Sequence, residues 1–237
     1  MPVEDTNDNL LEAVQSGDLE RVRVSLEKGA DPNAKFEEGD DVLGVAVIQR
    51  RLEIVRMLLR AGARPNVMRW DGTTPLYWAA KNGSVELVEF LLEAGASVMA
   101  EPNSESTSLH VAAENGFTSV LQRLLAADGK QVIDRFDYIA RTPLTCAIQA
   151  RQFAAAQMLI AAGADVNAHD KERIGNTALH FAAEDGDCEA VELLLGAGAD
   201  PAIPGWMGIT AIGKAERSDD EKGRRILALL KEASDRR

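Results

Sequence analysis

The sequence predicts an all-α protein built from about seven tandem repeats, and three observations lead to this fold class. A short motif returns every 33 to 35 residues along most of the 237-residue chain. Each copy contains two stretches whose apolar residues have the i, i+3, i+4 spacing of a helix face. A glycine-alanine pair closes most copies, where a helix is expected to end. The repeat starts are Asp8, Asp41, Thr74, Thr107, Thr142, Thr177 and Thr210.

The first expected helix of each repeat begins directly after the threonine or aspartate. The third repeat reads Thr74-Pro75-Leu76-Tyr77-Trp78-Ala79-Ala80. Threonine is a good N-cap residue, and proline suits the first helical turn. The leucine and the alanines lie two, five and six positions after the cap, so they share one buried face. The small alanines let a second helix approach closely.

A turn and a second helix complete the repeat. Nine positions after the cap stands a turn glycine, such as Gly83, and the second apolar stripe follows, as in Val88-Leu91-Leu92. Gly95 then ends this helix, because glycine readily takes the left-handed conformation of a helix C-cap. Segments such as Asp31-Pro32-Asn33 turn the chain back toward the next repeat.

With its period and its Thr-Pro-Leu-His type of motif, the chain resembles the ankyrin repeat family over residues 8 to 232. The resemblance implies helix–turn–helix units, joined by β-hairpin-like fingers and stacked into a curved solenoid. Its concave side would carry the fingers and the first helices. We expect one ankyrin-repeat domain over residues 1–237. Its units are expected near residues 8–35, 36–68, 69–101, 102–135, 136–169, 170–204 and 205–234.

Several positions depart from the repeat pattern. Arg50 and Arg151 stand where the turn glycine is expected, and two-residue insertions occur at 128–134 and around 169–173. We expect both insertions on the finger side, the side on which repeat insertions usually serve binding. The ends read as polar caps, which stacked repeats need. Ser25 replaces a leucine in the first unit, and the last unit ends in a charged helix over Arg224 to Lys231.

Charge and composition narrow the function classes. The chain has 26 basic and 38 acidic residues, a net charge of −12, so nucleic acid is an unfavourable partner. The dense basic cluster Lys222, Arg224 and Arg225 lies beside three acidic residues and is interpreted as a solvated helix face. Two cysteines form no disulfide framework and suit a reducing compartment.

The amino-terminal segment predicts no membrane targeting. Its first nine residues are acidic and polar, and no apolar run reaches the roughly 18 residues that span a bilayer. We therefore expect a cytoplasmic protein without membrane insertion. Signal-independent secretion stays open.

The sequence indicates no catalytic, cofactor or metal site. We therefore expect a protein that is not an enzyme and binds no cofactor or metal. His110 and His180 hold the same position two repeats apart, roughly 20 Å at helix-layer spacing, too far to share a metal. The resemblance implies that this histidine hydrogen-bonds at the corner between finger and helix. Cys146 and Cys188 lack the spacing of a zinc site. No nucleophile-elbow, phosphate-loop or HExxH motif is present.

The binding signal is a set of apolar side chains at positions that the repeat leaves free. Apolar patches on one side of a soluble protein mark interaction sites, and aromatic residues are common hot spots. We assign Val45, Val111, Cys146 and Ile139 to packing, favour binding for Trp70 and Trp78, and leave Trp206 open between binding and sealing of the stack. The expected partner-binding residues are Trp70, Trp78, Lys81, Asn82, Glu114, Asn115, Tyr138, Ile174, Phe181, Glu184, Asp185, Trp206 and Met207.

These features predict a non-enzymatic module that binds a protein partner through its concave face, as an adaptor, inhibitor or effector-like binder. Because the polar rim is acidic toward the C-terminal half, a partner with basic groups and an apolar anchor fits, and we expect a monomer. One alternative is an immunity-type protein that masks a basic toxin. The others are an accessory domain of an enzyme and a self-associating scaffold.

Overall fold

The computed structural model describes residues 3–36, 39, 41–99, 106–170, 172 and 175–236. Within these residues the chain forms fourteen α-helices and no strand, apart from one isolated antiparallel bridge between Lys35 and Asp41. The all-α repeat prediction is therefore confirmed. The helices gather in two compact units, Met1–Ser108 with Ala126–Asp128, and Leu109–Leu125 with Gly129–Arg237.

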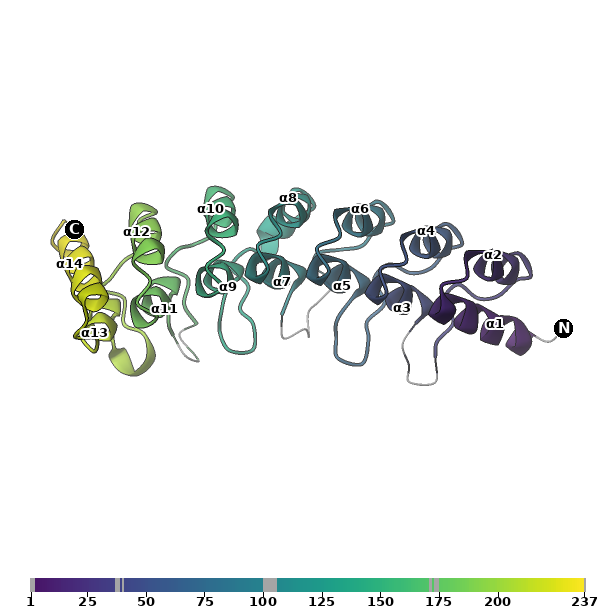
Figure 1. Cartoon of the computed structure of the whole chain (residues 1–237), viewed down its shortest axis with the longest axis horizontal. Coiled ribbons are helices and arrows are strands. Elements are labelled where there is room, and N and C mark those ends of the chain that lie inside the picture. Colours follow the sequence, from purple (N-terminus) through teal and green to yellow (C-terminus); the bar gives the residue numbers. More distant parts are fainter. Residues whose placement is uncertain are drawn as a thin grey trace. The chain divides into compact units, whose positions relative to one another are not determined.

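The first unit contains three helix pairs. They are α1 (Val3–Ser16) with α2 (Leu19–Glu27), α3 (Val42–Ile48) with α4 (Leu52–Arg60), and α5 (Pro75–Lys81) with α6 (Val85–Glu93). The first helices α1, α3 and α5 pack side by side in one row, and α2, α4 and α6 form a second row (Figure 1). The finger between α4 and α5 extends from the row of first helices, away from the second row (Figure 1).

The second unit repeats this arrangement. Its pairs are α7 (Ser108–Glu114) with α8 (Thr118–Ala126), α9 (Pro143–Gln149) with α10 (Phe153–Ala161), α11 (Ala178–Glu184) with α12 (Cys188–Gly196), and α13 (Ala211–Ala215) with α14 (Glu221–Asp235). Two 3-10 turns, η1 (Gly129–Val132) and η2 (Trp206–Gly208), join helices. Contacts of α9 with α11, and of α11 with α13, place these first helices side by side within the second unit.

The capping residues act as the motif predicts. Thr74 and Thr142 accept a hydrogen bond from the backbone N–H three residues later, and each is followed by proline at the start of its helix. Asp41 caps α3 in the same way. Each such cap contributes about 1 kcal/mol to stability. Leu76 and Leu91 of the third repeat are almost fully buried and form part of its core.

The turn between paired helices requires a left-handed residue. Gly83 has φ 68°, and Arg50 and Arg151, which stand at the same repeat position, have φ 59° and 56°. The arginines therefore take the glycine conformation, at a steric cost of roughly 1 kcal/mol that glycine avoids.

The ends of the chain differ from the expected helix bounds. Helix α1 begins at Val3, so Asp8 lies inside the helix and does not cap it. No proline or glycine stands between Val3 and Asp8 to stop the helix from extending. At the other end, α14 runs over Glu221–Asp235, longer than the expected Arg224 to Lys231, because Asp220 rather than a later residue caps it.

The insertion at 128–134 does not lengthen a fingertip, contrary to expectation. Its residues form the 3-10 turn η1 directly after α8, with Val132 and Ile133 buried. A side chain at Gly129 would collide with the backbone carbonyl of Leu124. The extra residues thus pack beneath the second helix. Part of the later insertion, around 169–173, lies outside the described residues.

Candidate functional site

Three fingertips share one turn geometry. In each, the backbone N–H of the first residue donates to the carbonyl oxygen four residues later, at 2.8 to 3.0 Å. The turns are 69–73, 137–141 and 205–209. The second residue of each is a large aromatic that faces solvent, and Trp70 is 81% exposed, Tyr138 59% and Trp206 52%. Aromatic side chains held out by a hydrogen-bonded turn are available to a partner.

Neighbours of these aromatics enlarge the apolar tips. Met207, beside Trp206, is 80% exposed. Ile139, beside Tyr138 and expected to pack, is 36% exposed. The backbone N–H of Ile139 donates to the Asp137 carboxylate at 3.1 Å, which fixes the backbone of this tip. Ile174 lies outside the described residues.

Trp78 differs from Trp70 because it is half-buried against its own finger. Its indole N–H donates to the hydroxyl oxygen of Thr73 at 2.9 Å, and that hydroxyl donates to Asp71 at 2.6 Å. Burial alone would raise the pKa of Asp71, but the hydrogen bonds from Thr73 and the charge of Arg69 lower it. The carboxylate therefore stays ionised and fixes Trp78.

Two cations lie over the Trp78 ring. The Arg69 guanidinium is 5.4 Å from the ring centroid and the Lys81 ammonium 4.7 Å, with Lys81 also 5.9 Å from the Tyr77 ring. Lys81 is exposed. A cation over an exposed aromatic ring contributes about 0.5–1 kcal/mol. This end of α5 is therefore both aromatic and positive.

Asn82 has a structural task that the sequence did not reveal. Its side-chain amide donates to the carbonyl oxygen of Val47 at 3.2 Å, which ties α5 to α3. Asn115, at the same repeat position, is exposed and donates to Val111 in its own helix at 2.8 Å. Both side-chain amides therefore donate a hydrogen bond within the protein.

The acidic residues of the second unit divide into paired and unpaired groups. Glu184 accepts an ion pair from Lys214 at 2.8 Å, and Glu114 lies 3.8 Å from Arg141. Asp185 is exposed and forms no ion pair in the described part of the chain. Partial burial first, and then the charges of Glu184 and Asp187, raise its pKa.

Residues on the first helices, four positions after the cap, are mostly packed. Val111 and Cys146 are buried, as expected, while Val45 and Phe181 are half-buried. Burial raises the pKa of the Cys146 thiol to about 12, so the thiol is unreactive near neutral pH.

His110 and His180 are structural, in agreement with the resemblance. His110 Nε2 donates to the carbonyl oxygen of Arg141 at 3.0 Å, and His180 Nε2 donates to that of Ile209 at 3.1 Å. Burial lowers the pKa of both, that of His110 to about 4. The described residues contain no cluster of three or more metal-ligating side chains.

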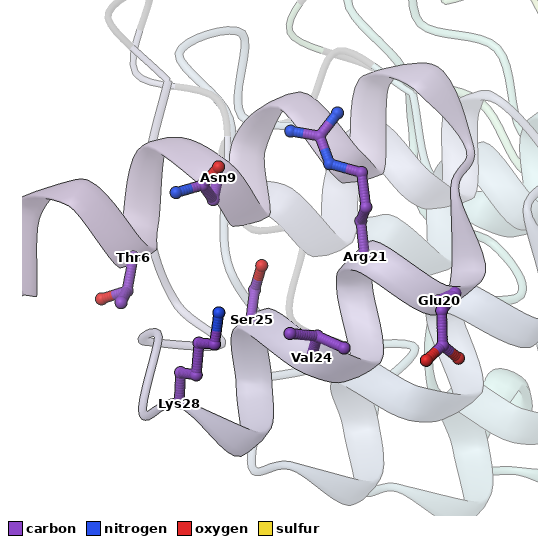
Figure 2. Close-up of a pocket in the computed structure, with 7 residues that line it drawn as sticks. All are labelled: Thr6, Asn9, Glu20, Arg21, Val24, Ser25 and Lys28. Carbon is purple, nitrogen blue, oxygen red and sulfur yellow. The ribbon is translucent and has the colours of Figure 1, made fainter. Parts of the chain in front are cut away.

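Surface hollows lie away from the fingertips. One of about 230 Å³ opens between α1 and α2, where Ser25 of α2 and Lys28, directly after α2, face Asn9 of α1 (Figure 2). Ser25 occupies the repeat position of the buried leucines Leu58 and Leu91, and its smaller side chain leaves this space. The hollow is therefore a consequence of the polar end cap.

A basic stretch in the first unit was missed at the sequence level. Residues 42–81 contain seven basic and two acidic side chains, a net charge of +5 in a chain of −12. Adding the charges repeat by repeat would have revealed it, whereas a search for dense clusters did not.

No described helix is long and apolar enough to cross a membrane.

Comparison with known proteins gives related repeats. A family model described as ankyrin repeats (3 copies) matches residues 10–102 and 97–170, and another described as ankyrin repeats (many copies) matches 159–212. Inversin of Gallus gallus is 41% identical over 69 residues, which are 29% of this chain. The matched part spans only 6% of the length of inversin.

Solved structures agree over nearly the whole chain. The ankyrin repeat domain of Bcl-3, a unique member of the IkappaB protein family, is 27% identical with a TM-score of 0.79, covering 94% of this chain and 97% of that one. The human ASB11 ankyrin repeat domain is 26% identical with a TM-score of 0.79, covering 93% and 96%. Since the family models match well over half of the residues, the chain belongs to the ankyrin repeat family.

Proposed function

We propose that the protein is a non-enzymatic module that binds a protein partner through the face formed by its fingertips and first helices. The observation that carries this proposal is the exposure of Trp70, Tyr138 and Trp206 at three hydrogen-bonded turns. A solvent-exposed tryptophan adds little to folding, but it can contribute about 2–4 kcal/mol when a partner buries it. Ankyrin repeats generally serve protein–protein interaction, which supports the same conclusion.

Partner chemistry follows from the groups beside the apolar tips. In the second unit, Asp185 offers a carboxylate that forms no ion pair within the described residues, and Trp206 with Met207 offers an apolar surface. A partner with basic groups and an apolar anchor would fit this part. An adaptor, an inhibitor, an effector-like binder and an immunity-type protein all use such a surface. We place the protein in the cytoplasm as a monomer.

The test is capture of the partner from extracts of the source cells by Trp70→Ala and by the unchanged protein. Trp70→Ala should lower partner affinity by roughly 30-fold or more and shift the melting temperature by less than about 2 °C. Leu19→Ala is the matched control, because Leu19 is an exposed apolar residue, at 45%, outside the fingertips.

Equal capture by Trp70→Ala and Leu19→Ala, with both folded, would refute this use of the fingertip face. Trp78→Ala should behave differently, since Trp78 packs on Thr73 and loses a hydrogen bond. We expect it to lower stability by about 2 kcal/mol as well as to weaken capture. Light scattering at several concentrations separates a monomeric binder from a self-associating scaffold.

A further inference from the structure

The third-repeat patch, which we define as Arg69, Trp70, Trp78 and Lys81, is positive and aromatic. We propose that it takes an acidic segment of the protein partner, in which an apolar side chain stacks on Trp70 and a neighbouring carboxylate pairs with Lys81. This inference rests on the proposed function and names the chemistry that one part of the face selects.

The charge of Lys81 has no counterion among the described residues. It is exposed, and it forms no ion pair with any carboxylate of the described residues. Its ammonium instead lies over Trp78 and Tyr77. A ring face restrains the ammonium but cannot satisfy three N–H donors. The restrained cation loses less side-chain entropy when a carboxylate arrives, which favours binding.

The same repeat position carries the opposite charge elsewhere. Seven residues after the cap stand Lys81 in the third repeat, Glu114 in the fourth and Glu184 in the sixth. Arg141 lies 3.8 Å from Glu114, and Lys214 lies 2.8 Å from Glu184. The two glutamates therefore have cations of the following repeat, whereas the charge of Lys81 is left for an outside group.

Asp71, the carboxylate nearest along the finger, is already occupied. Its Oδ1 accepts from both the backbone N–H and the hydroxyl of Thr73, at 2.9 and 2.6 Å. The positive charge of Arg69 further holds the pKa of this carboxyl low, against the effect of burial. Asp71 thus serves to hold Trp78 in place, and no ion pair between Asp71 and Lys81 is found in the described part of the chain.

The charge around the patch favours an acidic chain over other polyanions. The patch has two cations over the Trp78 ring, Arg69 and Lys81. They attract carboxylates at short range, within a Debye length of about 8 Å at physiological salt. A nucleic acid would extend its phosphates beyond this patch and meet the rest of a chain with net charge −12. A short acidic peptide segment avoids that repulsion.

The experiment uses the three tryptophans as reporters, because each indole N–H gives its own NMR signal. The probe is a synthetic ten-residue peptide with one phenylalanine flanked by aspartates. A twin peptide with lysine in place of aspartate and a single-stranded ten-thymidine oligonucleotide are the comparisons. We expect the acidic peptide to move the Trp70 signal and leave that of Trp206 in place, with Lys81→Gln weakening binding about threefold and Lys81→Arg restoring it.

The proposal is overturned if the lysine peptide or the oligonucleotide moves the Trp70 signal as strongly, if Lys81→Gln binds unchanged, or if no probe moves it at millimolar concentration. If the peptide experiment fails but Trp70→Ala still abolishes partner capture, only the preference for an acidic segment is rejected. Retained capture by Trp70→Ala rejects the proposed function instead.

Discussion

The two compact units use the same repeat positions for different purposes. Three residues after the cap, the first unit has Gly44 and Tyr77, while the second has the buried His110 and His180. Seven residues after the cap, the first has Lys81, which pairs with no carboxylate among the described residues, while the second has the paired Glu114 and Glu184. At this repeat position, the second unit therefore uses its carboxylates to join neighbouring repeats, whereas the first unit has a cation that can bind an outside group.

This difference shows that the charge a surface offers to a partner cannot be read from a count of its acidic and basic residues. Glu114 and Glu184 make the second unit look acidic, yet each faces a cation of the next repeat. Lys81 is one positive residue in an acidic chain, yet no described carboxylate offsets it. Which charges remain for a partner depends on pairing across repeats, and that pairing is a property of the fold.

The largest expected difference between the units is their response to acid. All three histidines lie in the second unit. The pKa of His110 falls from about 6.5 in an unfolded chain to about 4 in the fold. The unfolded state therefore binds more protons between these values, and stability is lost as pH falls from 6.5 to 4. The loss from His110 alone is on the order of 3 kcal/mol.

Amide hydrogen exchange, corrected for intrinsic rates, measures this difference. Protection in α9 and α11 should decline between pH 6.5 and 4.5 before protection in α3 and α5 does. His110→Gln, which cannot titrate, is the control and should reduce the gap. Equal loss of protection in both units would mean that buried histidines do not set the acid response.

A smaller effect comes from the charges seven residues after the cap. Glu184→Gln removes the partner of Lys214, whose side chain is only 7% exposed, so a nearly buried ammonium loses its counterion. We expect a loss of about 1–2 kcal/mol in urea unfolding. Lys81→Gln should change stability by less than about 0.5 kcal/mol. Similar losses of unfolding free energy in the two variants would contradict the difference between a charge paired across repeats and one without such a partner.

The smallest effect concerns the two arginines with left-handed backbone. Arg50→Gly should stabilise the protein by about 0.5–1 kcal/mol, because glycine relieves the steric cost at φ 59°. Arg151→Gly should gain less, since Arg151 forms an ion pair with Asp187 at 2.7 Å. Thermal melts of the two variants test this, and a larger gain at Arg151 would contradict the value assigned to its ion pair.

Much of the fold follows from the sequence because the repeat positions have fixed physical tasks. Thr74, Thr142 and Thr177 precede helices as predicted, since capping depends on a few adjacent residues. The site was harder to predict, because exposure depends on neighbours distant in the chain. Trp70 and Trp78 read alike in sequence, but only Trp78 meets Thr73. The η1 turn likewise depends on the packing of Val132 and Ile133, which spacing does not reveal.

The central claim is that the partner contacts the fingertips and first helices, and site-specific photo-crosslinking tests it most directly. A benzoylphenylalanine placed at Trp70, at Trp206 or at Arg60 would be irradiated in the presence of the captured partner. Arg60 is exposed on α4, in the row of second helices. The account predicts crosslinks from positions 70 and 206 and none from position 60. Crosslinks from position 60 alone would contradict it and place the partner on the second helices.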